Sequence, residues 1–517
     1  MEPEDRQKIS LVLILLLPIL FWLEAARRTE VLHPPKWRSL FALLKLTPQK
    51  PLLIIAFIGG LIFACSLIFL IKKLSVSDFS GAPYKKFYRG TKIISKSDLE
   101  KKTLEKKAEQ IKVAGVPMPR KIENLHLLIG GSTGSGKSVL IRELVFSALL
   151  RGDRLIIADP NGDMLSKFGT EKDIILNPYD ERSQGWSIFN EIRHDYDFKR
   201  FALSLVPRGE TPEGEEWASY GRLLLSETAQ KLFLMGKHSI QELFHWTTIA
   251  QPDDLKAFLG DTAAESLFVG ATRALASARF VLSSKLSSHL SMPKGEFSLR
   301  NWLDDPDGGN LFITWREDMA VALRPLISSW VDVLCTSILS LPEDEKTNVV
   351  PSRRLWMVID ELASLENLAS LGDAATKGRK VGLRLVAGLQ STAQLDKIYG
   401  REEAQTLRSC FRSLIVLGGA KTDPKTCEDM SLSLGEHEVE RESVNKTSQK
   451  GSTGTSRQQN NVRERVVMPS EIASLPDLKG FIAFAGAYDV ASIQLTPLNF
   501  LNRLPAFIHA EGRPPKV

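Results

Sequence analysis

Runs of apolar residues that end in small polar turns recur along the chain from about residue 120 onward. Seven such runs cover residues 125–129, 155–158, 311–314, 355–359, 383–388, 414–417 and 481–484. Segments with the 3.6-residue apolar period of amphipathic helices separate them. Because buried parallel strands are apolar on both faces and alternate with helices, this pattern predicts an α/β fold built on a largely parallel sheet.

Two intervals break this rhythm. Residues 195–290 show only the amphipathic helical pattern, which predicts an all-helical insertion. We therefore expect an all-α domain of residues 191–294 inside an α/β domain made of residues 121–190 and 295–517. Residues 441–461 are rich in Ser, Thr, Gln, Asn and Lys and lack apolar periodicity, so they are expected to form a mobile surface loop.

The N-terminal region holds two apolar stretches. Residues 9–23 contain no charge, and residues 52–71 are long enough to span the hydrocarbon layer, which takes about 20 helical residues. We expect the first stretch, lengthened by its flanks, to span the membrane as well. A signal peptide and a helix on the membrane surface are the alternatives. Residues 1–75 are thus predicted to be a two-helix transmembrane anchor, with a linker over residues 76–120.

The net charge of +6 is unevenly distributed. Residues 1–120 hold 21 Lys and Arg against 10 Asp and Glu, whereas the remaining residues hold 46 against 51. Since the body of the protein is mildly acidic, any contact with DNA must come from a local lining such as a pore. The four cysteines form no C-x-x-C pair, which excludes a disulfide framework and gives no zinc site.

A phosphate-binding loop is the most specific motif in the sequence. Residues 131–138 match G-x-x-x-x-G-K-[ST] and lie between a predicted strand and a predicted helix. The nucleotide-binding residues are expected to be Gly131, Ser132, Thr133, Gly134, Ser135, Gly136, Lys137 and Ser138. In this motif the backbone amides and Lys137 hold the phosphates of ATP, and the Ser138 hydroxyl holds Mg²⁺. The alternative is a degenerate loop that binds phosphate without hydrolysis.

Two carboxylates follow the apolar run of residues 355–359, as in a Walker B strand. Asp360 is expected to reach Mg²⁺ through water, and Glu361 to take a proton from the attacking water. The alternative is a buried strand whose acidic residues cap the next helix.

Three further polar positions are candidates with open alternatives. Gln390 follows the strand predicted over residues 383–388 and could contact the γ-phosphate or its water, or it could be an ordinary turn residue. Arg379 could act as an arginine finger on a neighbouring subunit, or lie in a solvated basic turn. Residues 159–163, Asp-Pro-Asn-Gly-Asp, are better explained as turn chemistry than as part of the site.

The order of these features resembles the type IV conjugative coupling proteins of the TrwB and TraD kind. The resemblance rests on the two-helix anchor, GSTGSGKS, LIIADPNGD, the helical insertion, LWMVIDELASL and GRKVGLRLVAGLQST, and it covers nearly the whole chain. It implies a RecA-like P-loop NTPase core and a hexameric ring in a bacterial inner membrane. The chain would cross that membrane twice, with its bulk in the cytoplasm.

The resemblance also implies a function and a role for each matching residue. ATP hydrolysis would drive single-stranded DNA, with its bound relaxase, toward the inner-membrane components of a type IV secretion channel. Lys137 and Ser138 match the P-loop roles, Asp360 and Glu361 the Walker B roles, Gln390 the sensor amide and Arg379 the interface arginine. Trp217 matches an aromatic residue that lines the DNA passage, where stacking on bases is independent of sequence; a core tryptophan is the alternative.

Two other functions remain open from the sequence. One is a type IV secretion ATPase that exports protein, and the other is a membrane receptor that docks the relaxosome and uses nucleotide as an assembly switch. The sequence shows no extended acidic C-terminal tail, in contrast to longer relatives, so we expect the helical domain to contact the relaxosome.

Overall fold

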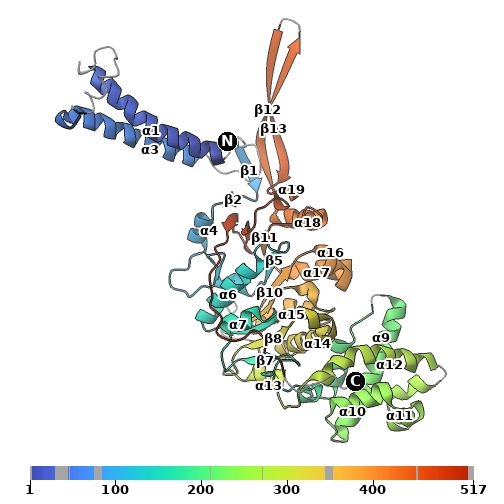
Figure 1. The fold of residues 1–517 in the computed structure, drawn as a ribbon. Helices are drawn as coiled ribbons and strands as arrows, with labels where there is room; N and C mark the ends of the chain where they lie inside the picture. Colours follow the sequence, from blue (N-terminus) through green and yellow to red (C-terminus); the bar gives the residue numbers. More distant parts are fainter. Residues whose placement is uncertain are drawn as a thin grey trace. The chain divides into compact units, whose positions relative to one another are not determined.

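The computed structural model describes residues 3–28, 45, 47–74, 84, 86–209, 211–269, 272–343, 353–449 and 452–510. The chain divides into two compact units, Met1–Pro83 and Tyr84–Val517. Figure 1 shows the elements of both units along the chain.

The N-terminal unit is a helical pair. It consists of α1 (Pro3–Arg28), the short η1 (Thr47–Gln49) and α3 (Pro51–Leu74). A Cβ atom on Gly60 would lie 2.8 Å from the Cα atom of Pro18, so the two long helices touch backbone to backbone where glycine allows it. The indole N–H of Trp22 donates a hydrogen bond to the Thr47 hydroxyl over 3.1 Å. These contacts join the two helices into one hairpin.

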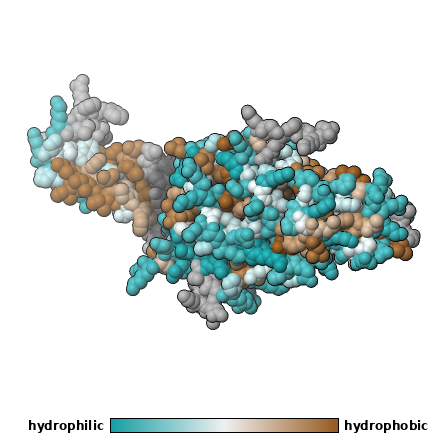
Figure 2. Space-filling view, turned by 90° about the horizontal axis from the view of Figure 1, so that it is seen from below, coloured by the Kyte–Doolittle hydropathy of each residue, from teal (hydrophilic) through white to brown (hydrophobic). Residues whose placement is uncertain are grey.

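Large apolar side chains cover the outside of this helical pair. Leu15, Leu16, Ile55 and Ile62 are each more than half exposed, and Figure 2 shows the hydrophobic surface of the unit in brown. Within the described residues, Pro51–Phe69 and Glu317–Leu339 are long and apolar enough to cross a membrane. The second segment is largely buried in the protein core, whereas the first is largely exposed. The N-terminal unit is therefore a membrane anchor, because water would penalise such a surface.

The second unit is built on a ten-stranded sheet with the strand order β2-β15-β14-β11-β5-β10-β9-β6-β8-β7. The strands are β2 (Ile93–Ile94), β5 (Leu127–Gly130), β6 (Arg154–Pro160), β7 (Ile174–Leu176), β8 (Leu311–Trp315), β9 (Leu355–Ile359), β10 (Leu383–Leu389), β11 (Ser413–Leu417), β14 (Lys479–Ala483) and β15 (Val490–Gln494). All pairs from β11 to β7 are parallel, and β14 is antiparallel to both its neighbours. The predicted α/β class and its largely parallel sheet are confirmed.

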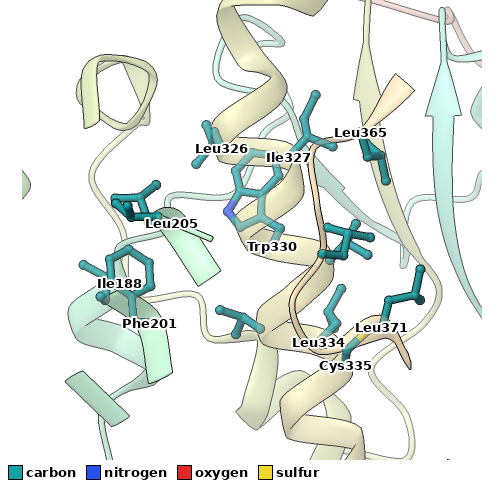
Figure 3. Packing of buried hydrophobic residues seen from close by; sticks show 14 of the residues in the cluster. Ile188, Phe201, Leu205, Leu326, Ile327, Trp330, Leu334, Cys335, Leu365 and Leu371 are labelled. Atoms are coloured by element: carbon teal, nitrogen blue, oxygen red, sulfur yellow. The ribbon is translucent and has the colours of Figure 1, made fainter. Parts of the chain in front are cut away.

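Helices cover both faces of this sheet because successive strand residues point to opposite sides. Leu127 and Ile129 pack into one core, with α6 (Lys137–Leu150) and α7 (Asp163–Phe168), whereas Leu128 packs into the other. The second core contains residues of α13 (Leu299–Asp304), α14 (Ala320–Leu339), α15 (Leu371–Lys377), α16 (Thr392–Tyr399) and α17 (Arg401–Cys410). Figure 3 shows Trp330 of α14 at its centre, facing Leu205 and Phe201.

The residues between β7 and β8 are mainly helical. They form η2 (Ile188–Glu191), α8 (Tyr196–Leu205), α9 (Pro212–Leu234), α10 (Ile240–Phe244), η3 (His245–Ile249), α11 (Pro252–Leu259), η4 (Ala263–Phe268), α12 (Thr272–Leu286) and η5 (Ser287–Ser291). Phe201 of α8 and Leu282 of α12 share one apolar cluster with the sheet-side residue Trp330. The boundary of a separate all-α domain at 191–294 therefore stays a prediction, as do the other domain boundaries.

Residues 441–461 correct one prediction, because their backbone forms strands rather than a loop. β12 (Glu436–Gln449) and β13 (Ser452–Arg465) pair antiparallel along their whole length, and β1 (Lys86–Gly90) adds a third strand beside β12. Figure 1 shows this hairpin extending well beyond the ten-stranded sheet. Ion pairs stabilise its base, including Arg463 with Glu436 and Arg441 with Glu464. Main-chain pairing runs along both strands of the hairpin, and Val439 is buried near its base.

Between the anchor and β5 the described chain is also ordered, although it was predicted to be a linker. It contains β1, β2, α4 (Lys96–Thr103), β3 (Lys112–Val113), β4 (Val116–Pro117) and α5 (Arg120–Glu123). Residues 76–83 and 85 of the predicted linker lie outside the described residues. The last helices of the unit are α18 (Pro424–Leu434) and α19 (Pro469–Ile472).

A buried ion network closes the amino-terminal edge of the sheet. Glu123 accepts hydrogen bonds from Arg151 over 2.6 and 2.9 Å and from Arg384 over 2.9 Å, and all three side chains are almost fully buried. Asp153 accepts from Arg151 and from the Trp356 indole. Each charge is compensated only as long as its partners remain in place.

We expect Glu123→Ala to lower the melting temperature of the detergent-solubilised full chain by at least about 5 °C. The substitution leaves the buried guanidinium of Arg384 without its carboxylate and Arg151 with Asp153 alone, and breaking a buried pair costs about 3–5 kcal/mol. Thermal unfolding followed by circular dichroism measures the shift. Glu171→Ala is the matched control, because Glu171 is exposed and should leave the melting temperature unchanged. Equal melting temperatures for the two variants would contradict the role given to the network.

Candidate functional site

The loop between β5 and α6 has the geometry of a phosphate cradle. Gly134 and Gly136 adopt left-handed φ angles of 81° and 114°, which residues with a Cβ rarely do. Main-chain hydrogen bonds fix both sides of the loop: the Gly131 N–H donates to the Leu389 carbonyl and the Ser132 N–H to the Gly418 carbonyl. The free N–H groups at the start of α6 and the helix dipole attract an anion to this point.

Lys137 lies inside the loop and is almost completely buried. Its ammonium group donates hydrogen bonds to the carbonyls of Gly131 over 2.7 Å and Ser132 over 3.1 Å. Burial lowers the pKa of Lys137, and the nearby carboxylates of Glu361 and Asp360 oppose that shift. The loop therefore holds a buried ammonium group next to two carboxylates, at the position that contacts phosphate oxygens in this motif.

Asp360 and Ser138 meet at the carboxyl end of β9. The Ser138 hydroxyl donates to an Asp360 carboxylate oxygen over 3.3 Å. Burial raises the pKa of Asp360, while Lys137 and the Ser138 hydrogen bond oppose the rise. A hydroxyl and a carboxylate oxygen at this spacing are the oxygen ligands that suit Mg²⁺ beside a phosphate.

Glu361 is a buried carboxylate without a hydrogen bond of ordinary geometry to either oxygen. Burial raises its pKa, whereas Lys137 and then the Gln390 amide oppose the rise. A buried acceptor that lacks a partner is costly, so such groups occur mainly where chemistry uses them. Glu361 can accept a proton at this position.

Gln390 lies at the carboxyl end of β10, beside the phosphate loop. Its side-chain oxygen accepts a hydrogen bond from the Thr133 hydroxyl over 3.1 Å. The structure thus brings together Thr133, Lys137, Ser138, Asp360, Glu361 and Gln390 at one edge of the sheet.

Arg379 and Trp217 do not lie with these residues. Arg379 is exposed in η8 (Gly378–Val381), just before the amino end of β10, whereas Gln390 follows its carboxyl end. A seven-residue strand separates them, about 23 Å of extended chain. Trp217 lies on α9 with 48% of its surface exposed. It is therefore not a core tryptophan.

Three further charged side chains interact with Asp360, and of these the sequence pattern gave no indication of Arg142 and favoured turn chemistry for Asp159 and Asp163. Arg142, one turn into α6, forms an ion pair of 2.8 Å with Asp163 at the start of α7, and both groups affect the pKa of Asp360. Asp159 ends β6 and accepts hydrogen bonds from the Met164 and Leu165 amides, while burial raises its pKa to about 7. The DPNGD turn therefore helps to shape the electrostatics around Asp360. The sequence signal for this role was the position of the turn at the carboxyl end of a predicted central strand.

Comparison with known proteins places these features in a family. The family model described as "Type IV secretion-system coupling protein DNA-binding domain" matches residues 110–496. Coupling protein TraD of Escherichia coli (strain K12) is 29% identical over 427 residues, which are 79% of this chain and 58% of TraD. The chain thus spans less than two thirds of that relative's length.

Solved structures of the coupling protein TrwB are similar over most of the chain. The unbound monoclinic form of TrwBdeltaN70 is 64% identical, with a TM-score of 0.78, and the match covers 84% of this chain and 99% of that one. TrwB in complex with ADP and Mg²⁺ gives the same identity and TM-score over 84% and 100% of the two chains. TrwB in complex with the ATP analogue ADPNP gives a TM-score of 0.77 at the same identity and coverage.

We expect Gly388→Ala to disturb this edge of the sheet. A Cβ atom on Gly388 would lie 1.7 Å from the Asp360 carbonyl oxygen, so the end of β9 would have to move and carry Asp360 with it. The melting temperature should fall by several degrees, because forced close contacts in protein cores lower the free energy of unfolding by about 1–3 kcal/mol. Gly372→Ala, in α15 with open space around it, is the matched control and should not lower the melting temperature. A Gly388→Ala variant as stable as that control would contradict the close contact.

Proposed function

The chain belongs to the type IV secretion-system coupling proteins, and we propose that it hydrolyses ATP to move DNA through a membrane-bound ring. The observation that carries this proposal is the meeting of Lys137, Asp360 and Glu361 at one phosphate cradle, in a chain 64% identical to TrwB. TrwB has been solved in complex with ADP and Mg²⁺ and in complex with ADPNP. At this identity, ATP and Mg²⁺ are the ligands expected here.

The residues of the cradle have separate roles in this proposal. The amides of residues 131–138 and the Lys137 ammonium bind the phosphates, and Ser138 and Asp360 hold Mg²⁺. When bound, Mg²⁺ supplies positive charge to the phosphate oxygens. Glu361 takes the proton of the attacking water, which its raised pKa favours. The Gln390 amide orients that water or contacts the γ-phosphate.

Arg379 can act only on another copy of the chain. It is exposed and lies at the sheet edge opposite the cradle of its own chain. In a ring where the carboxyl edge of one sheet meets the amino edge of the next, its guanidinium would stabilise charge on the neighbour's γ-phosphate. We propose a homohexamer on this basis and on the family resemblance.

Trp217 is proposed to contact single-stranded DNA by stacking. Its half-exposed indole offers a flat surface to any base, independent of sequence. Glu213, Glu215 and Glu216 precede it at the start of α9, so phosphate binding is disfavoured at this point. Base stacking is therefore the contact that fits.

The remaining partners follow from the membrane anchor and the family. ATP is cytoplasmic, so both helices of the anchor are proposed to span a bacterial inner membrane with the bulk of the chain in the cytoplasm. We propose that the protein receives relaxase-bound DNA from the relaxosome and passes it to inner-membrane components of the secretion channel during plasmid conjugation.

ATP turnover by the purified full chain in lipid nanodiscs tests the function. We expect single-stranded DNA to raise the rate several-fold, and the rate per subunit to rise with protein concentration as the ring assembles. Lys137→Ala should lower kcat at least 100-fold, because the phosphates lose their buried cation. Lys101→Ala, on an exposed helix, is the control.

The outcomes separate the three candidate functions. Turnover that does not respond to DNA would favour a protein-exporting ATPase. Nucleotide binding without turnover would favour a receptor that uses nucleotide as a switch.

Mixing two inactive variants tests the role of Arg379. Arg379→Ala and Lys137→Ala should each abolish turnover in homogeneous rings. In mixed rings some interfaces pair an intact Lys137 with an intact neighbouring Arg379, so activity should return to roughly a quarter of the wild-type rate in a random one-to-one mixture. If mixing restores no activity although mixed rings form, Arg379 does not act between subunits.

A further inference from the structure

One hydrogen bond joins the phosphate loop to the end of β10. The Thr133 hydroxyl donates to the Gln390 side-chain oxygen over 3.1 Å. A threonine hydroxyl can both donate and accept, so Thr133 can hydrogen-bond either end of the amide, and here it donates to the oxygen. Thr133 is exposed on the loop. The space beside the neighbouring Gly134 is open, because a Cβ atom built on it would have no other atom within 4 Å.

The hydrogen bond to Thr133 uses the oxygen end of the Gln390 amide. With its oxygen turned to Thr133, Gln390 presents its NH₂ group to other partners, and its proximity stabilises the ionised form of Glu361. If the amide were flipped, its oxygen would face that carboxylate, and two acceptors would then repel each other. Glu361 therefore favours one of two amide orientations that have similar shape and opposite chemistry, and Thr133, which can bond either orientation, holds the amide in place beside the loop.

Other contacts near Gln390 hold its backbone rather than its amide. The Thr392 N–H donates to the Thr426 hydroxyl over 2.9 Å, and the Thr426 hydroxyl donates to Ser391 over 3.4 Å. Among the hydrogen bonds of the described residues, the one from Thr133 is the only geometrically well-formed bond to the Gln390 side chain.

We propose that Thr133 is a positioning residue that holds the Gln390 amide beside the phosphate loop, within reach of Glu361 and the attacking water. This inference rests on the proposed ATPase function. Thr133 belongs to the phosphate loop, which binds the nucleotide, and Gln390 follows β10. The hydrogen bond between them therefore couples nucleotide binding to the position of the Gln390 amide. Thr133 acts on Gln390 and not on the phosphates, so its hydroxyl influences the rate of turnover rather than nucleotide affinity.

The test compares Thr133→Val, which keeps the shape but removes the hydroxyl, with Thr133→Ser, which keeps the hydroxyl. The full chain in lipid nanodiscs is assayed for kcat and KM with saturating single-stranded DNA. We expect Thr133→Val to lower kcat about tenfold with KM within about twofold, since one hydrogen bond is lost. Thr133→Ser should retain at least half of the wild-type kcat. Thr376→Val is the matched control, because its exposed hydroxyl bonds only within α15 and to Cys410.

A double variant separates positioning from general damage to the loop. If Thr133 acts through Gln390, Thr133→Val should cost nothing further in a Gln390→Ala background. An additive loss, a Thr133→Val enzyme with wild-type kcat, or a Thr133→Ser enzyme as slow as Thr133→Val would each overturn the inference. Wild-type protein that turns over no ATP would overturn the proposed function and this inference together, whereas the other three results leave the ATPase function standing.

Discussion

The attachment of the phosphate loop to the strands on either side of β5 is the constraint on which the rest of the site depends. Two main-chain hydrogen bonds, from Gly131 to Leu389 and from Ser132 to Gly418, tie the loop to the ends of β10 and β11. Parallel strands end at the same edge, so this attachment also aligns the cradle with Asp360 and Gln390. The backbone of the sheet therefore determines where the side chains of the site lie relative to one another.

Most of the sheet was predictable because its central strands are buried on both faces. Such strands must be continuously apolar, and each of the seven predicted runs overlaps a strand of the structure. The strands that the pattern missed, β2, β7 and β15, are short or carry polar residues at the edges of the sheet. The hairpin of β12 and β13 was mistaken for a loop because paired backbones give no signal in the apolar pattern.

The site was predictable to the extent that its chemistry is local in the sequence. The phosphate loop and the pair Asp360 and Glu361 are contiguous motifs, so their spacing was sufficient to identify candidates. The pair Arg142 and Asp163 joins two helices, and the contact of Thr133 with Gln390 spans more than 250 residues. Contacts of that kind depend on which strands become neighbours, and one sequence does not contain that information.

The position of Arg379 at the edge opposite its own cradle has a consequence for any ring of these subunits. Two copies that share a nucleotide in this way meet through unlike surfaces, and repetition of such a contact gives the closed ring a rotational sense. In such a ring each subunit would supply its Arg379 to one neighbour and receive the Arg379 of the other. In the proposed ring, hydrolysis at one site would therefore involve one defined neighbour, and the two directions round the assembly would not be equivalent.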